Sequence, residues 1–242
     1  MSLNKIAGEQ EEEIRRSKII DEQKTEFISI ASHEIKTPIT VIKAYAQIAK
    51  KAKDDNSQFL KEIVEKIDFQ SSKLLSLVQQ LLDVSKIENG SLIYSMEQVS
   101  ICSFILEMAS IMRHILPNHE LITELCEDVD VRIDKLRMEQ VFSNILGNAA
   151  KYSEKNTVIK ITSILDEGFV KICVSDQGIG MSTGGMKSIF EKFYRNEDVI
   201  RTHAGLGMGL YITSKIVTDH GGKIWVTSDE GLGSRFYFTV PF

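Results

Sequence analysis

The sequence predicts an α+β protein in which an N-terminal antiparallel helical hairpin is followed by an α/β sandwich with a mixed sheet. Apolar residues recur at helical spacing from Glu11 to about Ala52, and again from Phe59 to about Ile87. After Gly90, short runs rich in β-branched residues alternate with helical segments. Helices that come first, and strands interleaved with helices that come later, indicate two domains of different architecture.

The two N-terminal helices are long, and the first contains a proline. Residues 53–58 supply turn-forming residues between the helices, and Gly90 lies where the second one ends. Pro38 falls inside the first helix, where proline removes a backbone donor at a cost of roughly 3 kcal/mol. A lone hairpin cannot bury two such apolar faces, whereas two copies can bury them in a four-helix bundle. We therefore expect a homodimer formed through the hairpin.

The second half of the chain predicts an amphipathic helix and two β-hairpins. The helix covers residues 135–153. Residues 157–178 contain two β-rich runs joined by Asp-Glu-Gly, which is a hairpin signal, and residues 224–242 repeat that pattern. Hairpins within an α/β arrangement favour a mixed sheet over a purely parallel one.

Composition and charge disfavour several classes of function. The 242 residues are 43% hydrophobic and 26% charged, which is typical of a globular protein with one large or two modest domains. A formal net charge of −5 argues against nucleic acid as a partner. Cys102, Cys126 and Cys173 lack CxxC spacing and predict reduced thiols in a cytoplasmic protein, not a zinc or redox site. No apolar run approaches a membrane span of about 18 residues, so we expect membrane attachment only through segments outside this sequence.

Three polar residues share one face of the helix 135–153. Asn144 and Asn148 are four residues apart, and Lys151 follows three residues later. Amide oxygens and an ammonium group suit a hydrated Mg²⁺ that carries a polyphosphate. On this helix alone, however, a solvated polar face is the favoured interpretation.

Two glycine-rich stretches add features of a nucleotide site. Asp176 follows a strand and precedes Gly178 and Gly180; its carboxylate can accept a hydrogen bond from an exocyclic amine such as that of adenine. The stretch 205–209 precedes a helix, where backbone donors can hold phosphate, and residues 181–204 are long and polar enough for a lid. The dinucleotide fingerprint, the P-loop and the protein-kinase signatures are absent, so a nucleotide would need another fold.

Five sequence motifs, in this order, resemble those of bacterial sensor histidine kinases. They are SHEIKTP (32–38), NILGNAAKYS (144–153), DQGIGM (176–181), IFEKFYR (189–195) and GLGMGL (205–210). The resemblance covers roughly residues 20–242 and implies a Bergerat-type ATP-binding fold. It divides the chain into a signalling-helix or linker remnant (1–19), a dimerisation and histidine-phosphotransfer domain (20–90) and a catalytic ATP-binding domain (91–242).

The resemblance also implies a role for individual residues. His33 would accept the γ-phosphoryl group of ATP, with Glu34 as its acid–base partner, and Thr37 would orient a water that dephosphorylates a response regulator. Asn148 would bind Mg²⁺, with Asn144 nearby. The positions implied for the phosphates are Lys151, Tyr152, Gly205, Leu206, Gly207 and Gly209. Those implied for the adenine end are Asp176, Gly178, Gly180 and Ser234.

The implied activity is that of a histidine kinase core in the cytoplasm, separate or as part of a membrane receptor, which phosphorylates an aspartate of a response regulator. Pro38 would leave the Glu34 carbonyl without its helical donor, so the helix could bend between kinase and phosphatase geometries. Two alternatives stay open. One is a clamp ATPase, although such relatives carry a catalytic Glu where this chain has Asn144; the other is a dimeric scaffold that acts as a phosphatase or pseudokinase.

Overall fold

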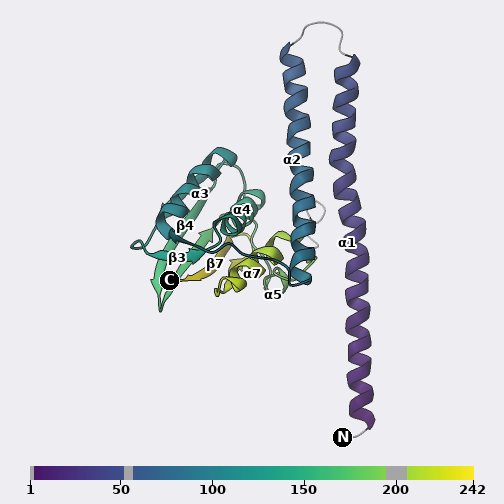
Figure 1. Ribbon diagram of the computed structural model, residues 1–242, viewed down its shortest axis with the longest axis vertical. Coiled ribbons are helices and arrows are strands. Elements are labelled where there is room, and N and C mark those ends of the chain that lie inside the picture. Colours follow the sequence, from purple (N-terminus) through teal and green to yellow (C-terminus); the bar gives the residue numbers. More distant parts are fainter. Residues whose placement is uncertain (1–2, 52–56, 195–205) are drawn as a thin grey trace. The chain divides into compact units, whose positions relative to one another are not determined.

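The computed structural model describes residues 3–51, 57–194 and 206–242 (Figure 1). The chain forms two units, a helical unit that ends at Leu82 and an α/β unit that begins at Asp83. None of the helices within the described residues is both long and apolar enough to cross a membrane. The division of domains after residue 90, expected from the motifs, stays a prediction.

The helical unit confirms the two long helices expected from the apolar periodicity. Helix α1 (Leu3–Lys51) continues through Pro38, and α2 (Ser57–Glu88) runs back antiparallel to it (Figure 1). Lys66 of α2 places its Nζ 5.4 Å from the ring centroid of Tyr45 in α1. Within one chain, much of the apolar surface of this hairpin stays uncovered. The exposed apolar side chains of the helical unit include Ile28, Ile39, Ile48, Phe59, Leu60, Val64, Phe69, Leu75, Val78 and Leu82.

The α/β unit contains a mixed sheet, as expected. Its elements are β1 (Glu97–Ser100), α3 (Ile101–Ile115), β2 (Glu120–Glu124), β3 (Asp130–Ile133), α4 (Lys135–Tyr152), β4 (Val158–Asp166), β5 (Phe169–Ser175), α5 (Thr183–Ser188), α7 (Gly209–Asp219), β6 (Ile224–Asp229) and β7 (Gly233–Pro241). The five-stranded sheet has the order β2-β4-β5-β7-β6, in which β2 pairs parallel with β4 and the other pairs are antiparallel. Strands β1 and β3 form a separate two-stranded ribbon.

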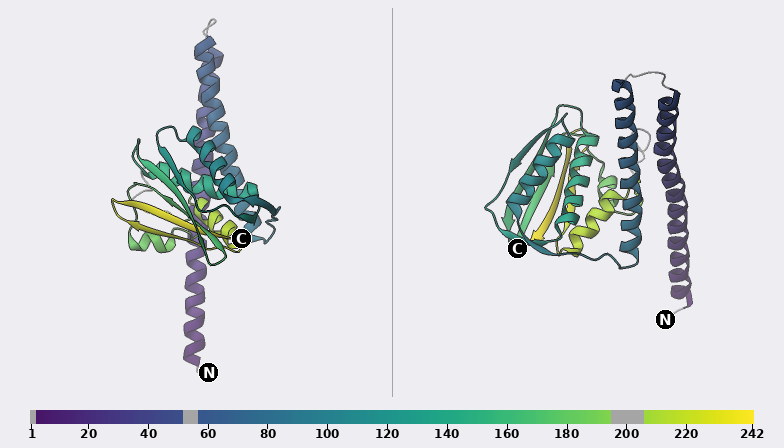
Figure 2. Two further views of the ribbon diagram at one scale, coloured as in Figure 1. Left: turned by 90° about the vertical axis from the view of Figure 1, so that its left-hand side faces the viewer. Right: turned by 45° about the horizontal axis from the view of Figure 1, so that its top comes forward.

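Helices α3, α4 and α7 cover one face of this sheet, and the core lies beneath them (Figure 2). Phe142 of α4 sits at its centre, with its ring centroid 5.6 Å from that of Phe104 and 5.3 Å from that of Phe238. All three side chains are buried. Both expected hairpins form: β4 and β5 are joined at Glu167 and Gly168, which have φ angles of 45° and 84°, and β6 and β7 form the second.

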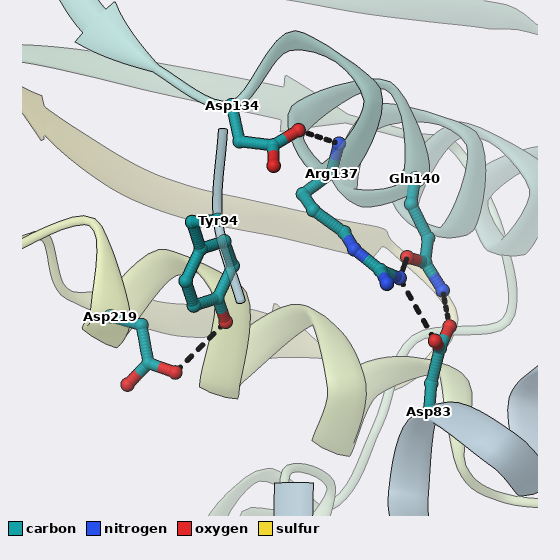
Figure 3. Close-up of polar contacts among 6 residues, drawn as sticks. All are labelled: Asp83, Tyr94, Asp134, Arg137, Gln140 and Asp219. Atoms are coloured by element: carbon teal, nitrogen blue, oxygen red, sulfur yellow. Dashed lines mark hydrogen bonds and ion pairs between the residues drawn. The ribbon is translucent and has the colours of Figure 1, made fainter. Parts of the chain in front are cut away.

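A buried carboxylate fixes the last turns of α2 in the α/β unit. Asp83 has no exposed side-chain surface, and its two oxygens accept hydrogen bonds from Arg137 Nη1 at 2.9 Å and Gln140 Nε2 at 2.8 Å (Figure 3). Arg137 and Gln140 lie in the first two turns of α4, which is capped by the Asp134 side chain. The sequence patterns did not predict this cluster.

The segment that follows α2 is also bound to the α/β unit. Tyr94 donates its hydroxyl to Asp219 at 2.8 Å (Figure 3), and the Ser95 amide donates to Asp134 Oδ2 at 2.8 Å. Burial, and secondarily Asp219, raise the pKa of Tyr94 well above its ordinary value. The Tyr94 ring also meets buried His220 edge-on, at 5.1 Å between centroids. His220 is therefore packed within the fold, as expected for a histidine that belongs to none of the five motifs.

Candidate active site

His33 lies on an exposed position of α1, in a stretch where hydroxyl side chains bond to the helix backbone. Thr37 Oγ1 donates to the His33 carbonyl at 3.0 Å, and Thr40 Oγ1 donates to the Lys36 carbonyl at 2.8 Å. Such back-bonding weakens and bends helices. Pro38 is buried and has no N–H for the carbonyl one turn earlier. The residues around His33 thus weaken the backbone hydrogen bonding of this part of α1.

The two asparagines on the polar face of α4 differ in their side-chain hydrogen bonds. Asn144 Nδ2 donates to the Gly209 carbonyl and to Thr213 Oγ1, both at 3.2 Å, so its amide is bound to α7. Asn148 lies one turn further on and is half-buried, and its side-chain amide makes no hydrogen bond to another described residue. Its amide oxygen is therefore available to a ligand on this face.

The C-terminal end of α4 is joined to the loop that follows β5. Ser153 forms an antiparallel bridge with Gly178, and the Ile179 amide donates to the Tyr152 carbonyl at 3.1 Å. Lys151 places its Nζ 5.0 Å from the centroid of the Tyr152 ring. Ser153 Oγ is buried and lacks a hydrogen-bond partner among the described residues. The basic end of the helix and the glycine loop thus form one local structure.

Asp176 is held by backbone donors through one of its two oxygens. Oδ1 accepts from the Gly178 amide at 2.8 Å and from the Ser234 amide at 3.1 Å. Burial raises the pKa of Asp176, and the hydrogen bonds from Gly178 and Ser234 oppose that rise. Neither of these backbone bonds uses Oδ2, which leaves an acceptor for a ligand amine.

Ser234 contacts Asp176 through its backbone, and its hydroxyl faces elsewhere. The side chain is 7% exposed, and Oγ lies 3.0 Å from Ser228 Oγ. The Asp176 amide also donates to the Ser234 carbonyl at 2.9 Å. Ser234 therefore helps to fix the Asp176 main chain and carboxylate together.

Close backbone contacts explain three glycines around Asp176. A Cβ on Gly178 would lie 2.6 Å from the Tyr152 carbonyl oxygen, and one on Gly180 would lie 2.0 Å from that of Asp229. A Cβ on Gly233 would lie 2.1 Å from the Asp176 carbonyl oxygen, and Gly233 also has a φ of +94°. The loop after β5 and the turn before β7 can approach only because these side chains are absent.

Replacement of Gly233 by Ala is expected to destabilise the α/β unit by about 2–5 kcal/mol, because strain at positive φ adds to an overlap with the Asp176 carbonyl. Gly231→Ala is the matched control. Gly231 has a φ of +78° in the same turn, but a Cβ there meets nothing within 4 Å, so strain alone should cost about 1–2 kcal/mol. Urea unfolding of both variants measures the difference. Equal losses would contradict the close contact.

The start of α7 offers backbone donors. Gly205 lies outside the described residues, Leu206 is buried, and Gly207 has a φ of +69°. Helix α7 begins at Gly209, and among the described residues no side chain caps it. The first N–H groups of a helix need partners, and phosphate oxygens can provide them. Of the expected lid, the structure describes residues 181–194, which include the short helix α5; the remainder lies outside the described residues.

Comparison with known families gives two matches in chain order. Residues 23–90 match the family model "His Kinase A (phospho-acceptor) domain". Residues 133–242 match "Histidine kinase-, DNA gyrase B-, and HSP90-like ATPase". The chain is also 31% identical over 229 residues to the sensor histidine kinase WalK of Bacillus subtilis (strain 168), covering 92% of this chain and 37% of WalK.

A solved catalytic domain of the histidine kinase ThkA is 30% identical to the chain and superposes with a TM-score of 0.52, covering 61% of this chain and 95% of that one. This chain belongs to the histidine kinase family. The solved complex of ThkA with the response regulator TrrA is 27% identical, has a TM-score of 0.63, and covers all of this kinase and 67% of the other chain. The kinase described here spans little more than a third of WalK.

The family and the fold class expected from the sequence are therefore confirmed. In this histidine kinase, Asn144, Asn148, Lys151, Tyr152, Asp176, Gly178, Gly180, Gly207, Gly209 and Ser234 all belong to the α/β unit, whereas His33, Glu34 and Thr37 belong to the helical unit. Thr213, the second partner of Asn144, was not predicted from the sequence. The sequence feature that could have predicted this contact is the spacing of four residues between Gly209 and Thr213, which puts both residues on one face of α7.

Proposed function

We propose that this histidine kinase transfers the γ-phosphoryl group of Mg-ATP to His33, and from there to an aspartate of a response-regulator receiver domain. The observation that carries the proposal is the exposed position of His33 in the segment that matches the phosphoacceptor domain. In the other unit, two backbone amides bind Oδ1 of Asp176, and neither of them binds Oδ2. We assign residues 1–19 to a linker, 20–90 to dimerisation and phosphotransfer, and 91–242 to ATP binding.

The adenine end of ATP is assigned to Asp176, whose Oδ2 accepts a hydrogen bond from the exocyclic amine. Gly178 and Gly180 let the backbone approach the base, and Ser234 supports Asp176 through its amide. The two backbone amides that donate to Oδ1 hold this carboxylate in place before the nucleotide binds, so binding requires little further ordering of the side chain.

The triphosphate is assigned to the end of α4 and the start of α7. The donor set fits a magnesium nucleotide: Asn148 offers an amide oxygen, with Asn144 nearby, and Lys151 and Tyr152 offer donors. The backbone of Gly205, Leu206, Gly207 and Gly209 completes the phosphate contacts. Bound Mg²⁺ neutralises phosphate charge. The absence of a carboxylate at Asn144 disfavours the clamp-ATPase alternative, because an amide cannot act as the base for water.

The transfer step forms a bond between an imidazole nitrogen of His33 and the γ-phosphorus, and breaks the bond from that phosphorus to the ADP oxygen. Glu34 accepts the proton from the other imidazole nitrogen. Catalysis here consists mostly of alignment and charge stabilisation. Thr37 orients a water when the same protein dephosphorylates its regulator. Its hydroxyl donates to the His33 carbonyl, and its oxygen can accept a hydrogen bond from that water at the same time.

The partners proposed are a second copy of the chain and a receiver domain, in the cytoplasm. The exposed apolar residues of the hairpin support the homodimer, since apolar patches of this extent mark interaction surfaces. The solved ThkA–TrrA complex supports a response regulator as the acceptor.

The proposal is tested by incubating the chain with Mg²⁺ and γ-labelled ATP, and by measuring the acid and alkali stability of the label. A phosphohistidine is expected to be labile in acid and stable in alkali. ATP labelled at the α-phosphate is the control, and it should leave no label. Stable label in acid, or no label despite measurable ATP binding, would contradict autophosphorylation.

Asp176→Asn is expected to weaken ATP binding by about 10–150-fold, since a hydrogen bond to a charged acceptor contributes about 1.5–3 kcal/mol. The two backbone donors keep an oxygen at Oδ1, so the new NH₂ faces the nucleotide amine. Asp166→Asn, at the exposed end of β4, is the matched control and should leave affinity unchanged. Equal affinities in the Asp176→Asn variant and the parent chain would remove Asp176 from the site.

The same substitution should stabilise the nucleotide-free chain at pH 7. The pKa of Asp176 is raised on folding, so the fold loses stability as pH rises from the ordinary aspartate value of 3.8 through the raised one. Asn removes that loss, so the free energy of unfolding at pH 7 is expected to rise. The gain should shrink toward pH 4, and urea titrations at both pH values measure it.

A further inference from the structure

Two hydrogen bonds that the Asn144 amide donates to α7 fix its orientation. Its Nδ2 lies 3.2 Å from the Gly209 carbonyl oxygen and 3.2 Å from Thr213 Oγ1. An amide NH₂ group carries two hydrogens, so both of its donors are used in these contacts. The nitrogen of Asn144 therefore faces these two acceptors. Oδ1 takes no part in either bond and lies 3.5 Å from where a Cβ on Gly209 would be.

The two acceptors make different contributions. The Gly209 carbonyl can only accept, so it decides which end of the amide faces α7. Gly209 also lacks a Cβ, which would lie 3.5 Å from Asn144 Cγ, so the amide lies against the start of the helix. Thr213 binds the second hydrogen, and because its side chain is 0% exposed, solvent cannot take the place of its hydroxyl.

We propose that Thr213 is a positioning residue that holds the Asn144 amide so that Oδ1 is presented to the Mg²⁺ of Mg-ATP. This inference rests on the proposed function, which places Mg²⁺ at Asn148 with Asn144 nearby. Without the Thr213 hydroxyl, one N–H of the half-buried Asn144 amide loses its partner, and the amide is free to turn about its side-chain torsion. Groups that orient a metal ligand in this way typically control about 10–100-fold in metal affinity.

Both helices also carry buried apolar side chains, so the hydroxyl can be removed while the apolar packing is kept. Ile145 on α4, and Ile212 and Ile216 on α7, are all 0% exposed. Thr213→Val keeps the branched shape and removes the acceptor. Thr213→Ser keeps the acceptor and removes the methyl group, which makes it the matched control.

The test measures the affinity of the full chain for a non-hydrolysable ATP analogue, with Mg²⁺ and with EDTA. The ratio of the two affinities is the gain that Mg²⁺ supplies. In Thr213→Val this gain is expected to fall about tenfold or more while the affinity in EDTA stays at the parent value. Thr213→Ser should keep the parent gain. The affinity in EDTA also reports whether each variant is folded.

Three results would overturn the assignment. An unchanged gain in Thr213→Val would show that Asn144 needs no orientation by the hydroxyl. An equal loss of affinity with Mg²⁺ and with EDTA would assign Thr213 to folding alone. A loss of the gain in Thr213→Ser as well would show that the hydroxyl is not sufficient, and would assign the effect to the packing of the side chain as a whole. A parent chain that binds the analogue with no gain from Mg²⁺ contradicts the proposed function itself, before any variant is compared.

Discussion

Replacement of His33 by Gln is expected to abolish labelling of the chain by γ-labelled ATP while its affinity for ATP stays unchanged. Gln is close in size and tolerated in a helix, but its amide nitrogen is not nucleophilic. His33 is exposed on α1, and its imidazole makes no hydrogen bond within the described residues. Helix stability should therefore change little, and the loss should be confined to the phosphoryl acceptor.

His114→Gln is the control for this variant. His114 is also exposed on a helix, α3, and it contacts a backbone carbonyl one turn earlier. It lies outside every motif, so the label should remain at the parent level. Labelling that survives in His33→Gln, or that disappears in His114→Gln, would place the phosphoryl acceptor elsewhere.

Replacement of Arg137 by Met is expected to destabilise the α/β unit by about 3–5 kcal/mol, because it removes the guanidinium from its ion pair with the buried Asp83 carboxylate. Met matches the length of the Arg stem, so the packing loss is small. Urea unfolding of the nucleotide-free chain measures the free energy. Hydrogen exchange in residues 83–95 should rise as well, since that segment is bound through this cluster.

Two controls separate the buried charge from other effects. Lys135 lies on the same helix as Arg137, and Lys135→Met removes its ion pair with Glu107 of α3. Both partners are partly exposed, so the loss of stability should be much smaller than in Arg137→Met. The double variant Asp83→Leu with Arg137→Met removes both charges and should be more stable than Arg137→Met alone. A double variant less stable than the single one would contradict the account of an uncompensated charge.

The features predicted from the sequence are those that depend on neighbours along the chain. Periodicity predicted α1, α2 and α4, and the Asp-Glu-Gly turn predicted the β4–β5 hairpin. The pairing of β1 with β3 was not predicted, because each strand has only four residues and its register depends on distant contacts.

For the candidate site, the motifs named the residues but not their contacts. Asp83 and Arg137 are 54 positions apart, and a buried ion pair leaves no local pattern in either helix. Asn144 was predicted near a metal from its spacing to Asn148. Its amide orientation depends on Gly209 and Thr213, which only the packing of α4 against α7 brings into reach.

The most direct test of the central claim is to identify the phosphorylated residue by tandem mass spectrometry, under alkaline conditions that preserve a phosphorus–nitrogen bond. The chain would be incubated with Mg-ATP, digested, and the peptide that spans residues 25–36 sequenced. The account predicts a single phosphoryl group on the His33 side chain. A phosphoryl group on another residue, or an unmodified peptide from a chain that binds ATP, would contradict it.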